Sequence, residues 1–392
     1  MAVGIGAMFM VFLATDGPII IMTTTETTTT ALQAQELFER AFPDVLSGVL
    51  PLRWLWRFAT RRFGWWAADW NAGHEPIATL LADGIMYGEG PRFRLDEQAL
   101  YLTDMYAKRV LKFDLQTKRL STAYQADEYV SGLGWLPDGR LLIVAMESRR
   151  LLVLDQQQPQ QAEEYADISA VTRFRANDMV VDARGRAYVG NYGFDFKTDF
   201  TAATTTMKTT LVRVDTDRSV HIEATRMFFP NGSVITPDGK TLIVAETFAG
   251  HLTAFDIRDD GSLSNRRVWA DVGAPCDGIA LDADGCMWVA VPQIGLYPTG
   301  GALIRVREGG EILNLYGLGQ NGISRSVFAC QLGTDADGKH HVFFLEATTS
   351  EEHRVLAGGE ERARRNCVLK SIEVAVGPAR VPGDTRYCGG YC

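Results

Sequence analysis

The sequence has few cysteines and fewer basic than acidic residues, and each shortage excludes a class of protein. Six cysteines among 392 residues are too few for a disulfide framework, and none forms the CxxC pair of a structural zinc site. The net charge of −9 argues against nucleic acid or an anionic membrane as the main partner, because phosphate binding needs clustered Lys and Arg. We therefore expect a soluble globular protein with free thiols.

Two common catalytic signatures are also missing. The sequence contains neither a GxSxG elbow nor an HExxH motif, which argues against a serine hydrolase and a zinc protease. The glycine-rich stretch 317–322 matches a dinucleotide-binding fingerprint, but the residues that follow it have the pattern of a strand instead of a helix. We interpret this stretch as a loop.

No long hydrophobic run marks a targeting or membrane segment. Residues 1–21 are largely apolar, but they contain no Lys or Arg and are broken at 16–18, so they make a poor signal peptide and too short a membrane span. With the Thr-rich stretch that follows, residues 1–30 are predicted to be a disordered extension. We expect a cytoplasmic location.

Residues 31–75 have helical spacing and are rich in aromatic residues and arginines. This pattern predicts an amphipathic helical segment with a basic face. We expect its tryptophans to pack on the main domain or on a second subunit of an oligomer. The alternatives are a lid or a contact with a membrane surface through residues 52–70.

From residue 76 onward the pattern is that of β-structure. Short alternating or β-branched runs are separated by Asp-Gly and Pro-Asp-Gly turns, which supply the positive φ that tight hairpins need. No long helical pattern intervenes. We predict an all-β domain at 76–378, followed by a tail at 379–392.

Six segments of this domain share one pattern around a tight turn. The turn residues are Glu97, Gly139, Gly185, Gly239, Gly285 and Gly338. The glycines recur at intervals of 46, 54, 46 and 53 residues, which is typical of propeller blades with four short strands each. The predicted fold is a six-bladed β-propeller with an N-terminal helical extension, in which residues 77–84 and 368–376 complete the last blade.

A ring of polar residues follows from the same alignment. The residues eight positions before the turns are Glu89, Ser131, Asn177, Asn231, Asp277 and Cys330. Taken singly, such residues beside Gly or Pro are frequent turn residues that bond their own backbone. Because equivalent residues of a circular repeat lie on a ring, however, we expect two carboxylates and two amides to converge at one mouth of the channel. Such oxygen ligands suit Ca²⁺ or Mg²⁺.

Four ordered motifs resemble the SMP-30/gluconolactonase/LRE-like family, also called regucalcin-like. They are residues 88–91 (GEGP), 175–178 (RAND), 230–232 (PNG) with 236–247, and 277–290. The resemblance covers about residues 76–378. It implies a six-bladed propeller with one divalent metal in the channel, in a family whose characterised members mostly hydrolyse lactones.

The resemblance also implies roles for individual residues. Glu89, Asn231 and Asp277 match the metal ligands of the family, and Asn177 matches an asparagine that completes the metal shell or contacts substrate. Arg175 matches an arginine that contacts substrate, and Asp195 aligns with an acidic substrate contact. Ca²⁺ is the expected ion, with Mg²⁺, Mn²⁺ and Zn²⁺ as alternatives.

The function expected from the sequence is metal-dependent hydrolysis of a small lactone or ester, with Asp277 orienting or deprotonating the attacking water. Two alternatives remain open. The same site could hydrolyse phosphotriesters, or the propeller could be a calcium-binding regulatory protein without catalysis. The sequence leaves undetermined the lactone, the physiological ion, the role of residues 31–75 and the oligomeric state.

Overall fold

The computed structural model describes residues 77–155, 157–158, 161–195, 208–292, 301–317, 323, 326–347 and 367–379, and two short strands nearer the N-terminus. The chain divides into two compact units, Met1–Asp69 and Trp70–Cys392. In the first unit, β1 (Met8–Met10) and β2 (Ile21–Thr23) pair antiparallel. The rest of the predicted extension at 1–30, the helical segment at 31–75 with its membrane contact at 52–70, and residues 380–392 of the tail lie outside the described residues.

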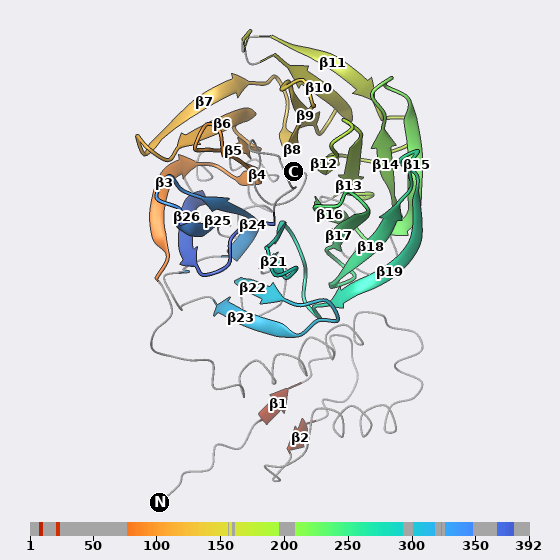
Figure 1. Cartoon of the computed structure of the whole chain (residues 1–392). Coiled ribbons are helices and arrows are strands. Elements are labelled where there is room, and N and C mark those ends of the chain that lie inside the picture. The colour runs from red at the N-terminus through yellow and green to blue at the C-terminus, as the bar shows by residue number, and fades with distance from the viewer. Residues whose placement is uncertain are drawn as a thin grey trace, which may run out of the picture. The chain divides into compact units, whose positions relative to one another are not determined.

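The second unit contains six four-stranded antiparallel sheets arranged around a common axis, which confirms the six-bladed β-propeller (Figure 1). Each sheet is a meander whose first strand lies nearest the axis. All of the regular elements among the described residues are strands. The described residues include no helix of the length and hydropathy that crossing a bilayer requires.

Five blades are continuous in sequence. The first is β4 (Gly88–Arg94), β5 (Ala99–Asp104), β6 (Arg109–Asp114) and β7 (Arg119–Gln125). The second is β8 (Val130–Trp135), β9 (Leu141–Ala145), β10 (Arg150–Leu154) and β11 (Ala162–Asp167). The third is β12 (Ala176–Val181), β13 (Ala187–Asn191), β14 (Thr209–Val214) and β15 (Val220–Met227). The fourth is β16 (Pro230–Ile235), β17 (Thr241–Glu246), β18 (His251–Ile257) and β19 (Leu263–Asp271). The fifth is β20 (Ile279–Leu281), β21 (Met287–Val291), β22 (Ala302–Val306) and β23 (Ile312–Gly317).

The sixth blade joins the two ends of the propeller. It consists of β24 (Ser326–Thr334), β25 (His340–Ala347) and β26 (Cys367–Val374), with β3 (Thr79–Ile85) as its outer strand. β26 and β3 pair antiparallel, with Leu369 opposite Ala82, and Figure 1 shows orange β3 beside blue β26. This pairing confirms the predicted closure of the ring, which ties the first strand of the domain to the last.

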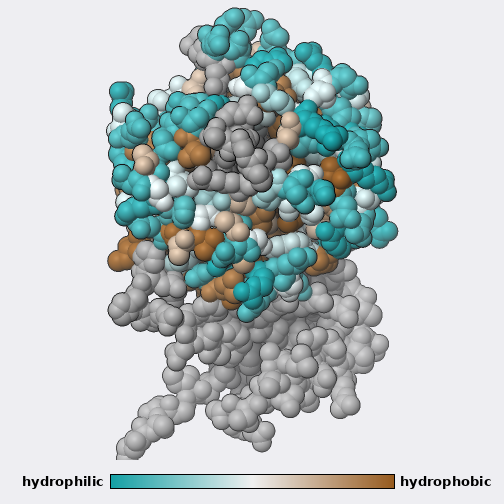
Figure 2. All heavy atoms as spheres, viewed as in Figure 1, coloured by the Kyte–Doolittle hydropathy of each residue, from teal (hydrophilic) through white to brown (hydrophobic). Residues whose placement is uncertain are grey.

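The hydrophobic cores lie between neighbouring blades. One cluster joins the first blade to the second through Tyr101 and Trp135, whose rings meet edge to face at 5.2 Å. Others join the second blade to the third, the third to the fourth and the fifth to the sixth. The outer strands are more polar, and Figure 2 shows mainly hydrophilic residues on the visible face of the propeller. Burial between blades is therefore what holds the ring of sheets together.

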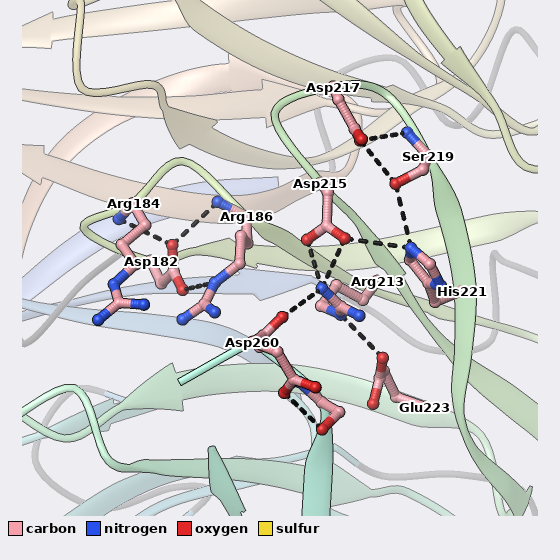
Figure 3. A network of polar contacts seen from close by, with 12 residues as sticks. Asp182, Arg184, Arg186, Arg213, Asp215, Asp217, Ser219, His221, Glu223 and Asp260 are labelled. Carbon is pink, nitrogen blue, oxygen red and sulfur yellow. Dashed lines mark hydrogen bonds and ion pairs between the residues drawn. The ribbon is translucent and has the colours of Figure 1, made fainter. Parts of the chain in front are cut away.

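Ion pairs supplement this packing where the third blade meets the fourth (Figure 3). Arg213 Nε donates to Glu223 Oε1 at 2.8 Å, and its Nη1 donates to Asp215 Oδ2 at 2.6 Å and to the Asp260 carbonyl at 2.9 Å. Arg213 and Glu223 are nearly buried. Because removing one partner would leave a buried charge uncompensated, this cluster favours one relative position of the two blades.

The predicted turn residues adopt the expected backbone in five of the six blades. Gly139, Gly185, Gly239, Gly285 and Gly338 all have φ between 70° and 90°. In the first blade the left-handed residue is Gln98, with φ 47°, so the prediction of Glu97 was wrong by one position. The first strand of that blade contains one additional residue, which keeps Glu89 in register with the other ring residues.

Candidate metal and substrate site

A β-bulge occurs near the ring residues in four inner strands. In β8, Val130 pairs with Ala145, and the next paired residue, Leu133, pairs with Ile143. The pairing shifts between Ala176 and Met179 in β12, between Pro230 and Ser233 in β16, and between Glu89 and Arg92 in β4. A bulge interrupts the regular alternation of side chains and is common beside active sites. It is the local feature that redirects these ring residues.

Three ring residues are joined by hydrogen bonds between their side chains. Asn177 Nδ2 donates to Asn231 Oδ1 at 2.9 Å, and Ser131 Oγ donates to Asn177 Oδ1 at 3.3 Å. Asn231 Nδ2 donates to Thr247 Oγ1 at 3.1 Å. In these bonds the amide nitrogens donate and the two Oδ1 atoms accept, which links the inner strands of the second, third and fourth blades.

The two ring carboxylates, Glu89 and Asp277, are buried. Their exposed fractions are 7% and 6%, and Glu89 Oε2 and Asp277 Oδ1 are wholly shielded from solvent. Taking carboxylates out of water is costly unless positive charge compensates them. The burial of two carboxylates on one ring is therefore the observation that best fits a bound cation.

Glycines next to the ring residues bring the inner strands close together. A Cβ atom on Gly232 would lie 2.6 Å from the Asp277 carbonyl oxygen, and one on Gly278 would lie 2.7 Å from the Cα of Ala329. One on Gly132 would lie 2.4 Å from the Met179 nitrogen. Only glycine permits such approach of one backbone to another, and the narrow ring depends on it.

Cys330 lies eight residues before its turn glycine, as the other ring residues do, but its environment differs from theirs. The bulge in β24 lies earlier, between Val327 and Ala329, so Cys330 pairs regularly with Phe344. Its thiol donates to the Gly278 carbonyl at 3.4 Å, within the core between the fifth and sixth blades. Burial raises the pKa of this thiol. Cys330 is therefore a packing residue.

Two channel residues, Asp178 and Arg92, were missed by the analysis of the sequence. Asp178 follows Asn177 and is buried, and it accepts a hydrogen bond from Ser131 at 3.4 Å. Burial raises the pKa of the Asp178 carboxyl, whereas Arg92 and Ser131 oppose that rise. Of the six residues that directly follow the ring positions, four are glycines. Asp178 stands where those blades have glycine, and this difference in the sequence alignment could have identified it as a candidate site residue.

Arg92 connects the first blade to the inner strands of the second and third blades. Its guanidinium donates to the Leu133 carbonyl at 3.1 Å, the Pro91 carbonyl at 2.8 Å and the Met179 carbonyl at 2.6 Å. Leu133 and Met179 lie two residues beyond their ring residues, so Arg92 bridges β8 and β12 one layer deeper.

The two predicted substrate residues lie outside the regular strands. Arg175 precedes Asn177 by two residues; its Nη2 pairs with Glu147 Oε1 at 3.1 Å and its guanidinium lies 5.0 Å from the centre of the Tyr129 ring. Asp195 follows β13, at the end of a described range, and residues 196–207 lie outside the described residues. The assignment of both residues to substrate contact stays a prediction.

Aromatic side chains, most of them buried, cluster at the end of the inner strands that lies toward Arg175. Two residues before the ring positions stand Tyr87, Tyr129, Phe229 and Phe328, and after the second strands of three blades stand Tyr106, Tyr192, Phe194 and Phe248. We call these eight residues the aromatic collar. Backbone bonds place both sets at the same end, since Met105 N donates to the Tyr87 carbonyl and Tyr192 N to the Arg175 carbonyl.

Glu246 holds the segment that enters β16. Its Oε2 accepts the backbone N–H of Phe228 at 2.8 Å, and its Oε1 accepts from Thr253 at 2.6 Å and Arg266 at 2.8 Å. Burial alone would raise the pKa of Glu246, but hydrogen bonds from His251, Thr253 and Phe228 together with the charge of Arg266 lower it to about 2.

We expect Glu246→Gln to lower the free energy of unfolding at pH 7 by up to about 3 kcal/mol. Because the folded pKa lies below the value of 4.5 for an unperturbed glutamate, this stabilisation is present above pH 4.5 and is lost as the pH falls toward 2. Urea unfolding at several pH values measures it. Glu311→Gln, at an exposed ion pair with Arg307, should change little. A Glu246→Gln deficit that is as large at pH 2.5 as at pH 7 would contradict the assignment.

The chemistry of the polar ring residues suits a hard cation. Among the described residues, no three His, Cys, Asp or Glu side chains cluster in a way that could hold a metal. The candidate donors on the ring are two carboxylates and two amide oxygens. Such oxygens are typical ligands of Ca²⁺ and Mg²⁺. Glu89, Asn177, Asn231 and Asp277 therefore fit the predicted ion, with the carboxylates supplying two negative charges.

Comparison with known proteins agrees with this geometry. The chain is 27% identical over 220 residues to the pentonolactonase XacC of Haloferax volcanii, covering 55% of this chain and 69% of that protein. It is 28% identical over 263 residues to lactonase drp35 of Staphylococcus haemolyticus (61% and 76%). It is 25% identical over 238 residues to a diisopropyl-fluorophosphatase of Loligo vulgaris (55% and 75%).

A solved structure shares the fold. It is described as a calcium-binding protein, regucalcin, from Agrobacterium tumefaciens, and superposes with a TM-score of 0.59 at 15% identity, covering 81% of this chain and 98% of that one. The family model for the SMP-30/Gluconolactonase/LRE-like region matches residues 87–335. The protein therefore belongs to the SMP-30/gluconolactonase/LRE-like family.

Proposed function

We propose that this protein is a metal-dependent lactonase that opens a cyclic ester at the polar ring of the channel. The observation that carries the proposal is the burial of Glu89 and Asp277 on one ring with the amide oxygens of Asn177 and Asn231. The names of the two lactonase relatives support a cyclic ester as the substrate. Glu89, Asn177, Asn231 and Asp277 would hold the cation, with Ca²⁺ as the expected ion.

The bound cation would act as a Lewis acid that polarises the lactone carbonyl and stabilises the negative charge developing on its oxygen. Asp277 would orient the attacking water and accept its proton, because a carboxylate at the edge of such a site can act as a general base. The water oxygen bonds to the carbonyl carbon, the ring C–O bond breaks, and the leaving oxygen takes up a proton. The product is a hydroxy acid.

Other residues of the channel would position the reactants. Asn177 and Arg175 would hold oxygens of the substrate, and Asp195 would contact it from the adjoining loop. Thr247 fixes the amide of Asn231 by accepting from Nδ2, which keeps Oδ1 on the ring. Arg92 bridges β8 and β12 beyond the ring, and substrate and water would enter from the opposite end, where Arg175 lies.

A second candidate is hydrolysis of a phosphotriester at the same ring. The match to the diisopropyl-fluorophosphatase favours it, because its name describes a phosphorus electrophile. The same cation could polarise a phosphoryl oxygen. The lactone remains the better proposal, since two of the three relatives compared are named for lactones.

The test is turnover by the purified full-length chain after EDTA treatment and reconstitution with Ca²⁺ or Mg²⁺. We expect a lactone panel to be hydrolysed in a pH-stat, with activity lost in EDTA and restored by the ion. Faster turnover of a phosphotriester would favour the second candidate. If EDTA lowers the Tm and no substrate is turned over with any ion, the cation is structural and the propeller is not a lactonase.

A further inference from the structure

A buried carboxylate occurs near the end of the second strand in three of the six blades. The three residues are Asp104 of β5, Glu246 of β17 and Glu346 of β25. Each has an exposed fraction of 0%, and each pairs with a basic side chain from a later strand of its own blade. The basic partners are Arg109 of β6, Arg266 of β19 and Lys370 of β26. Because burying a carboxylate is costly, its recurrence indicates a shared structural role.

In the first blade, Asp104 holds the backbone that leads to Glu89. Its Oδ1 accepts the N–H groups of Met86 and of the collar residue Tyr87, both at 3.0 Å. Its Oδ2 accepts from the guanidinium partner at 2.8 Å. Met105 completes this junction by donating its N–H to the Tyr87 carbonyl at 2.8 Å. One oxygen of the carboxylate is therefore bonded to two backbone N–H groups within three residues of a predicted cation ligand.

The fourth blade repeats this arrangement before Asn231. Glu246 Oε2 accepts the N–H of Phe228 at 2.8 Å, and Oε1 accepts from the guanidinium partner at 2.8 Å. Phe228 stands three residues before its ring residue, the position that Met86 has in the first blade. Thr247 donates its N–H to the carbonyl two residues before Asn231 at 3.1 Å. In both blades the carboxylate thus gives one oxygen to the cationic side chain and the other to the backbone ahead of a ring residue.

These bonds lie where the strand ladder is weakest. The pairing of β4 shifts between Glu89 and Arg92, and that of β16 shifts between Pro230 and Ser233. A bulge disrupts the ladder locally, so the backbone at the ring depends on bonds from outside the ladder. The buried carboxylates supply such bonds on the side that precedes each ring residue.

We propose that Asp104 and Glu246 are positioning residues of the cation site. Each fixes the backbone that carries one predicted ligand, Glu89 in the first blade and Asn231 in the fourth. The proposal rests on the cation site of the function proposed above and adds two residues from outside the ring. Partners of this kind typically affect metal affinity about 10- to 100-fold when they are removed.

The first experiment separates the backbone bonds of Asp104 from its charge. Two double variants, Asp104→Leu with Arg109→Met and Asp104→Asn with Arg109→Met, have the same net charge, but only asparagine keeps an oxygen that can accept from Met86 and Tyr87. The purified full-length protein, stripped with EDTA, is titrated with Ca²⁺ by calorimetry. We expect the leucine variant to bind Ca²⁺ about 10- to 100-fold more weakly than wild type, and the asparagine variant to stay within about threefold.

The fourth blade provides an independent repeat of the experiment. Glu246→Leu with Arg266→Met should weaken Ca²⁺ binding about 10- to 100-fold. Glu246→Gln with Arg266→Met should stay within about threefold of wild type, because the glutamine oxygen can still accept the N–H of Phe228. Titrations are made at a temperature where urea unfolding shows every variant to be folded.

The sixth blade supplies the matched control. Glu346 forms the same kind of buried pair with Lys370, but the ring residue of this blade is Cys330, a packing residue. Glu346→Leu with Lys370→Met should lower stability and leave the Ca²⁺ dissociation constant within about threefold of wild type. A general loss of packing would instead weaken Ca²⁺ binding here as much as in the other two blades.

The outcomes separate this inference from the proposed function. Equal Ca²⁺ affinities of the leucine and asparagine variants would overturn the role of Asp104, and equal affinities of the leucine and glutamine variants that of Glu246. An equal loss in the sixth-blade control would overturn both roles. If wild type binds Ca²⁺ but opens no lactone, the lactonase function fails and the affinities still decide the positioning roles. If wild type binds neither Ca²⁺ nor Mg²⁺, the cation site and the positioning roles fail together.

Discussion

Asp277→Asn should lower kcat/KM for lactones by about 100- to 10,000-fold, because in the proposed mechanism it removes both a negative charge that would hold the cation and the base that would accept a proton from water. Glu89→Gln should show a similar loss through weaker cation binding. Both carboxylates are buried on the ring, and each substitution preserves the size of the side chain. The measurement is turnover at saturating Ca²⁺, together with the Ca²⁺ affinity of each variant by calorimetry.

Asp238→Asn is the matched control for these changes. Asp238 is an exposed turn residue that accepts from Thr236 and from the Lys240 backbone, and an asparagine can accept the same bonds. We expect wild-type turnover and Ca²⁺ affinity from this variant. If Asp277→Asn and Glu89→Gln also retained both properties while folded, the polar ring could not be the catalytic site.

Gly232→Ala should reduce turnover by at least about 100-fold, because the added Cβ would push β16 away from the segment that contains Asp277. It would lie within 2.7 Å of Asp277 O, Gly278 Cα and Ile279 N, and these backbone atoms cannot move aside as a flexible side chain could. Displacing a reacting group by about 1 Å can cost 100-fold in rate. We also expect a stability loss of about 1–3 kcal/mol from overpacking.

Gly139→Ala separates the effect on the ring from a general loss of stability. Gly139 has φ 90° in a turn, and a Cβ there would have no atom within 4 Å. Alanine should cost about 1–2 kcal/mol through its backbone conformation, with unchanged kcat and Ca²⁺ affinity. Assays at a temperature where both variants are folded make the comparison. Equal activity of Gly232→Ala and Gly139→Ala would refute the role of close strand approach in the site.

The repeat made much of the fold predictable. Turn residues at nearly constant spacing, each between short β-branched runs, indicated six blades, and the outer strand β3 could be assigned because residues 77–84 had no other strand to pair with nearby. Local chemistry explains this success: glycine at positive φ and alternating apolar residues are required wherever the chain makes a hairpin. The first blade departs from the count because Gln98 takes the left-handed position and β4 contains an additional residue.

The candidate site was only partly predictable from the same count. Counting back from the turns identified four residues that the structure shows to be buried, namely Glu89, Asn177, Asn231 and Asp277. Two of these predicted ligands, Asn177 and Asn231, are joined by a hydrogen bond. Cys330 shares the count but not the environment, because the bulge in its strand lies earlier. Asp178 and Arg92 entered the site through contacts between blades, and such contacts depend on which side chains the neighbouring strands bring within reach.

By itself, the sequence determined the six-bladed fold and its closure, because these follow from residues that recur at fixed spacing along the chain. Only the tertiary structure decided that Asn177 bonds to Ser131 and Asn231, that Arg92 bridges β8 and β12, and that aromatic residues of separate blades pack into one cluster. The physical reason is that the period of a repeat fixes equivalence between blades, whereas bulges and close packing between strands fix where each equivalent side chain points.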